Sequence, residues 1–138
     1  MSLKHMWTLL SLALFAGGAM AEDGDAMNGK VVFERHCATC HGLEATGHGP
    51  MVTVLTLPPA DLTKLSAKQD GAFPVVRVVK RIDGRDPLVS HGSPMPVYGD
   101  FFEGQDVMIK SQSGQPIATS QPVADLVAYI QSLQVEQE

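Results

Sequence analysis

The chain has 138 residues, of which fifteen are acidic and ten basic, and its formal net charge is −5 at neutral pH. This balance argues against a general affinity for nucleic acid or for an anionic membrane surface. The length allows one domain, and a hydrophobic content of 44% is enough for a packed core. Because only two cysteines occur, a scaffold held together by several disulfides is excluded.

Residues 1–21 are predicted to be a secretory signal peptide. Lys4 supplies the positive start, an apolar run follows from 6 to 15, and small residues lead up to a cleavage site after Ala21. The alternative is a transmembrane anchor, which needs roughly 20 apolar residues to cross a bilayer, more than this core provides. We therefore expect residues 22–138 to form one domain that is exported to the periplasm.

The first part of this domain is predicted to be helical. A helix is expected from about 26 to 41 with Asp25 as its N-cap, and a short helical turn over 61–67. The valines of 75–82 favour a strand on propensity alone. The spacing of the polar residues in that segment, with Pro74 before it and a glycine after it, fits a helix better.

The second part alternates loops with one clear helix. Residues 42–59 and 86–99 are rich in Gly and Pro and are predicted to be loops, and 104–120 is turn-rich with room for an irregular hairpin around 107–109 and Ile117. The last helix has Pro122 in its first turn. Its apolar stripe consists of Val123, Leu126, Val127, Ile130 and Leu133. An all-α chain of three or four short helices supplies little core of its own, and it needs a large internal group to pack around.

The two cysteines and the following histidine indicate what that group is. Cys37, Cys40 and His41 form a Cys-x-x-Cys-His motif, which is read as a c-type haem attachment site. Positions i, i+3 and i+4 share one helical face, so two thiols can add to the two vinyl groups of a haem while the imidazole reaches its iron.

Three other interpretations of the motif compete. A thioredoxin-like redox pair requires a βαβ setting, which the surrounding pattern lacks. A structural zinc site requires four ligands, and no second cysteine pair completes one. A disulfide between Cys37 and Cys40 is compatible with export but leaves His41 unexplained.

The mature chain resembles a class I c-type cytochrome of the bacterial mono-haem kind. The likeness lies in the Cys37–Gly42 motif, the 47–50 loop, Met95-Pro96, and Gly29 and Phe33 in the first helix with Tyr129 in the last. The resemblance implies a cytochrome c fold with one covalently attached haem c and its iron, in which the first and last helices cross. Gly29 and Phe33 would then meet Tyr129, with the glycine permitting close backbone approach.

The second axial ligand is predicted to be Met95. Prolines on both sides hold its loop extended, and thioether sulfur stabilises ferrous haem iron. His91 is the main rival and would give a lower potential, whereas Met51 lies too close to the attachment motif. His41 and Met95 are thus the expected metal ligands.

Further haem contacts are less specific in the sequence. The resemblance assigns the hydrogen-bond acceptor of the ligating histidine to the carbonyl of Pro50, with Pro58 or Pro59 as alternatives. Haem propionates need cationic or amide donors. The available basic residues are Arg77, Lys80, Arg81 and Arg85, with Arg81 and Arg85 preferred, although each also fits a solvated helix face.

The resemblance implies an electron carrier rather than an enzyme. Single electrons would pass between redox protein partners by outer-sphere transfer through the exposed haem edge. The 99–121 segment is longer than a minimal member needs, and Phe101 and Phe102 in it are expected to shield the haem or to dock a partner. The alternatives are the haem subunit of a dehydrogenase complex, and a five-coordinate haem enzyme or gas sensor that lacks the Met95 bond.

Overall fold

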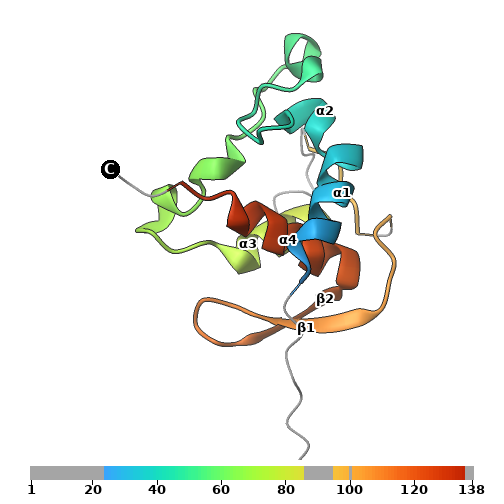
Figure 1. Ribbon diagram of the computed structural model, residues 1–138, viewed down its shortest axis with the longest axis vertical. Helices are drawn as coiled ribbons and strands as arrows, with labels where there is room; N and C mark the ends of the chain where they lie inside the picture. Colours follow the sequence, from blue (N-terminus) through green and yellow to red (C-terminus); the bar gives the residue numbers. More distant parts are fainter. Residues whose placement is uncertain (1–23, 86–94, 100, 136–138) are drawn as a thin grey trace, which may run out of the picture.

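The computed structural model describes residues 24–85, 95–99 and 101–135. The predicted signal peptide and His91 lie outside these ranges. The helices are α1 (Ala26–His36), α2 (Ala38–His41), α3 (Val75–Asp83) and α4 (Gln121–Ser132), with three short 3-10 turns, η1 (Pro50–Val54), η2 (Leu62–Lys64) and η3 (Ala67–Gln69). An antiparallel pair of strands, β1 (Asp106–Lys110) and β2 (Pro116–Ser120), lies below the helices in Figure 1. No helix in the described ranges has the length and apolar character needed to cross a membrane.

The first predicted helix is divided into two at Cys37. Asp25 is the N-cap of α1, as predicted, and its carboxylate accepts a hydrogen bond of 2.8 Å from the backbone N–H of Met27. At Cys37 the backbone departs from ideal helical angles, with φ at −111°, before α2 resumes at Ala38. Because of this break, the rest of the motif, Ala38–His41, forms a short helix of its own, α2.

Helices α1 and α4 cross closely, and this crossing is the centre of the core (Figure 1). At Gly29 an added Cβ would lie 2.0 Å from the carbonyl oxygen of Asp125, so only a glycine permits the approach. The rings of Phe33 and Tyr129 pack beside it with their centroids 5.3 Å apart. The structure thereby confirms the predicted meeting of these residues.

A buried carboxylate secures the same crossing. The side chain of Asp125 accepts a hydrogen bond of 2.7 Å from the backbone N–H of Asp25 and another of 2.7 Å from Nε2 of Gln121. The N-cap residue of α1 is thus tied directly to the second turn of α4. Because both donors satisfy the buried carboxylate, its burial is tolerated.

Segment 75–82 is helical, as predicted, and forms most of α3. Val75, Val78, Val79 and Ile82 are buried on one face of this helix. Gly84 ends it with a φ of +81°, a left-handed conformation that glycine adopts without strain. Amphipathic spacing therefore outweighs the preference of valine for strands.

The fold is dominated by helices but is not purely all-α, because 106–120 forms a β-hairpin, which confirms the hairpin expected around 107–109 and Ile117 and shows it to be regular. The register pairs Val107 with Thr119 and Ile109 with Ile117. These four side chains occupy one face, and three of them are buried while Ile117 is half-buried. In β1 the buried Val107 and Ile109 alternate with exposed residues, Met108 among them, as suits a sheet with one covered face.

Arg85 covers part of the free edge of this hairpin. The backbone bonds from Ser111 to Gln115 and from Gln121 to Gln105 mark hydrogen-bonded pairs at the two ends of the ladder. Because such pairs alternate, Ala118 lies at a position whose carbonyl points away from β1. The guanidinium of Arg85 donates to that carbonyl at 2.9 Å and also binds the carboxylate of Asp83. The end of α3 is thereby joined to β2.

Candidate functional site

The motif residues gather within one helical turn at the end of α1. The backbone N–H groups of Cys40 and His41 both donate to the carbonyl of Cys37, at 3.1 and 2.9 Å. Both cysteine thiols are free, with Cys37 buried and Cys40 half-buried. The turn therefore presents two thiols and one imidazole at the spacing that the sequence predicted.

Burial controls the chemistry of the first thiol. Desolvation, with a smaller contribution from Cys40, raises the pKa of Cys37 to about 12. A thiol that remains protonated at neutral pH is a poor nucleophile for disulfide exchange. This environment disfavours the thioredoxin-like interpretation. Within the described ranges, no group of three or more His, Cys, Asp or Glu side chains has an arrangement that could hold a metal ion on its own.

The imidazole of His41 is buried and held in one orientation. Its Nδ1 lies 3.0 Å from the carbonyl oxygen of Ala60. Because a carbonyl only accepts, Nδ1 carries the proton and Nε2 keeps its lone pair. Burial lowers the pKa of His41, and the hydrogen bond to Ala60 opposes this only in part. The structure thus holds a neutral imidazole whose second nitrogen is available to a metal.

The predicted acceptor of this hydrogen bond was wrong. Pro50 begins η1, and the carbonyl that accepts from His41 belongs to Ala60, the residue after the Pro58-Pro59 pair. The loop folds back because Gly47 has a φ of +87° and donates to the carbonyl of His41 at 2.8 Å. An alanine that acts through its backbone leaves no signal in the sequence, so only the path of the loop could reveal it.

The remaining predicted contacts are placed as follows. Met95 is half-buried and packs against the core. Met51 lies in η1 with 40% of its surface exposed. Arg81 is half-buried on α3, whereas the guanidinium of Arg85 is engaged with Asp83 and Ala118. The structure therefore commits Arg85 to joining α3 and β2, a role that its sequence position did not indicate.

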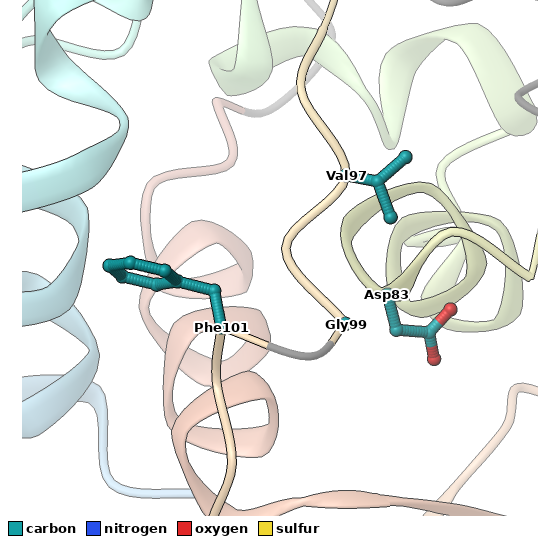
Figure 2. A pocket seen from close by; sticks show the side chains of 4 residues that line it. All are labelled: Asp83, Val97, Gly99 and Phe101. Carbon is teal, nitrogen blue, oxygen red and sulfur yellow. The ribbon is translucent and has the colours of Figure 1, made fainter.

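Three aromatic residues after Met95 pack around His36, the last residue of α1. Together with His36, the aromatic cluster consists of Tyr98, Phe101 and Phe102. The ring of Phe101 is 64% exposed and lies 5.0 Å from that of His36, centroid to centroid. Figure 2 shows it projecting toward α1 from the edge of an open pocket of about 510 Å³, whose other lining residues are Asp83, Val97 and Gly99. Phe102 is buried, and burial raises the pKa of the neighbouring Tyr98.

The comparison with protein families agrees with this arrangement. Residues 26–134 match the family model described as cytochrome c. The chain belongs to the cytochrome c family. The match extends from the start of α1 past the end of α4, so it includes the hairpin. Neither the curated proteins nor the solved structures contain a match to the chain.

Membership in the cytochrome c family implies a covalently bound haem c with its iron. The donor set in this structure fits that group. The two thiols are unpaired, and the imidazole beside them has its Nδ1 engaged and its Nε2 available. Several apolar side chains on the loop after the motif are exposed and suit an apolar ring: Leu43, Val54 and Leu57. Cytochromes of this family are haem proteins that transfer electrons.

Proposed function

We propose that this cytochrome is an exported, mono-haem carrier of single electrons between protein partners. Cys37 and Cys40 bind the haem through thioether links, and His41 binds its iron through Nε2. The observation that carries this proposal is the 3.0 Å contact between Nδ1 of His41 and the Ala60 carbonyl, beside two free thiols. That contact fixes the tautomer and the ring orientation that an axial ligand requires.

Met95 is proposed as the ligand on the opposite side of the iron. Its thioether is soft and favours the ferrous state, which raises the reduction potential. The segment that carries it is anchored, because the backbone N–H of Tyr98 donates to the carbonyl of Ile82 at 2.8 Å. Pro96 restricts the chain between these two residues. An iron with one ligand on each side keeps its coordination geometry when the oxidation state changes.

The haem, when bound, accepts and releases one electron. The protein contributes a fixed set of ligands, an apolar surrounding and an exposed edge, so no side chain acts as an acid, a base or a nucleophile. The proposed signal peptide, residues 1–21, directs export and is then removed, and covalent attachment retains the cofactor in the periplasm. The partners are redox proteins, and the acidic chain favours surfaces other than those that recognise a lysine ring.

The test is a visible spectrum of the purified exported protein in both oxidation states. We expect covalent haem in the wild type and a weak charge-transfer band from iron–sulfur ligation in the ferric state. Met95→Ala should remove this band and lower the potential, whereas the control Met51→Ala should do neither. Rapid binding of carbon monoxide to the reduced wild type would instead indicate an open iron site and would support the enzyme or gas-sensor alternative.

A further inference from the structure

Tyr98 joins the 95–99 segment to two helices, α1 and α3. Its hydroxyl donates to the carbonyl of His36 at 3.1 Å, and its backbone N–H donates to the carbonyl of Ile82. Its ring stacks on that of Phe102, with an interplanar angle of 20° and a centroid distance of 5.2 Å. One side chain therefore contacts α1 while its backbone is fixed to α3.

The position of the hydroxyl contact is specific. His36 is the last residue of α1 and directly precedes Cys37. The final carbonyls of a helix have no partner within the helix, so an outside donor is needed there. Tyr98 supplies that donor from the third residue after Met95. The hydrogen bond thus joins the segment that carries Met95, one proposed iron ligand, to the helix that leads to His41, the other.

The ring alone does not account for this arrangement. A phenylalanine would stack on Phe102 and contact His36 equally well, because both contacts involve only ring atoms. The hydroxyl adds a bond to a backbone carbonyl 62 positions away in the sequence. Its loss would leave the segment anchored through the Ile82 contact and the ring contacts, but without a hydrogen bond to α1.

We propose that Tyr98 is a positioning residue for the axial ligand: its hydroxyl holds the 95–99 segment against the end of α1 and so keeps Met95 on the iron. This inference rests on the proposed role of Met95. It goes further by assigning the stability of the iron–sulfur bond to one hydrogen bond outside the ligand set. Weak thioether ligation makes this bond sensitive to how firmly its segment is held.

The experiment measures the replacement of Met95 by imidazole in the ferric holoprotein, followed by loss of the sulfur charge-transfer band. Tyr98→Phe removes the hydroxyl and keeps the ring. We expect it to tighten apparent imidazole binding about fivefold, which corresponds to ~1 kcal/mol for a net hydrogen bond at about 1.4 kcal/mol per factor of ten. The spectrum without imidazole should retain the sulfur band.

Two controls separate positioning from a general loss of stability. Tyr129→Phe removes a tyrosine hydroxyl at the crossing of α1 and α4. Ile130→Val removes one methylene from the buried face of α4 and lowers the stability of the protein. Both should bind imidazole as the wild type does. The proposal is overturned if Tyr98→Phe matches the wild type, or if Ile130→Val tightens binding to the same extent. A Met95→Ala protein that keeps the sulfur band would show that the ligand assignment itself had failed.

Discussion

Replacing Gly29 with alanine should destabilise the protein through one atom. The new Cβ would lie 2.0 Å from the carbonyl oxygen of Asp125 and 2.5 Å from its carbon, both of which belong to the backbone of α4. Carbon–oxygen contacts of this kind rarely fall below about 3.3 Å. The two helices would therefore have to separate by roughly 1.3 Å, a shift that rotation of a side chain cannot provide.

The size of the effect follows from two opposing contributions. Overpacking against backbone costs about 3 kcal/mol, at the upper end of its usual range. Alanine recovers about 1 kcal/mol over glycine inside a helix. The expected loss is therefore about 2 kcal/mol, and the separation also loosens the packing of Phe33 on Tyr129. For a domain of this size the melting temperature should fall by about 8 °C.

Denaturant and thermal unfolding of the ferric holoprotein, followed by far-UV circular dichroism, measure this loss. Met27→Ala is the control, because Met27 lies on the same helix with 75% of its surface exposed. It should change stability by less than about 0.5 kcal/mol. A Gly29→Ala protein as stable as the wild type would refute the reasoning, since alanine would then have entered the crossing without displacing α4.

Three further results are expected. Asp125→Ala takes the shared acceptor from the backbone N–H of Asp25 and from Nε2 of Gln121, both in part-buried hydrogen bonds, and should lower the urea midpoint by an amount equivalent to about 1 kcal/mol. Arg85→Gln removes the ion pair with Asp83 and the bond to Ala118, and should increase hydrogen exchange in the hairpin while leaving exchange in α1 unchanged. Burial lowers the pKa of His41 from its usual 6.5, so as the pH falls below that value the unfolded chain takes up the proton first. Stability should therefore be retained above pH 6.5 and decline on acidification, as measured by urea midpoints across that range.

Local spacing determined much of this protein. The Cys37–His41 motif indicated its own chemistry, because the three side chains fall on one turn whatever surrounds them. Asp25 as N-cap and the helix over 75–82 also follow from local signals, and the apolar stripe of α4 needs only its 3.6-residue period. The division at Cys37 was not predicted, because the motif reads as uninterrupted helix.

Contacts between distant segments decided the rest. The acceptor for His41 is the backbone of Ala60, and the donor to His36 comes from Tyr98, and neither partner is marked by its neighbours in sequence. Arg85 fits a propionate ligand by charge, and the structure adds contacts of its guanidinium with Asp83 and a strand carbonyl that its sequence position did not indicate. Residue type and short-range periodicity can be read from the sequence. A hydrogen bond to a backbone carbonyl cannot, because it depends on the path of the backbone in the folded protein. That path is fixed by the helix crossing and the glycine turns, and it becomes known only when the whole chain is folded.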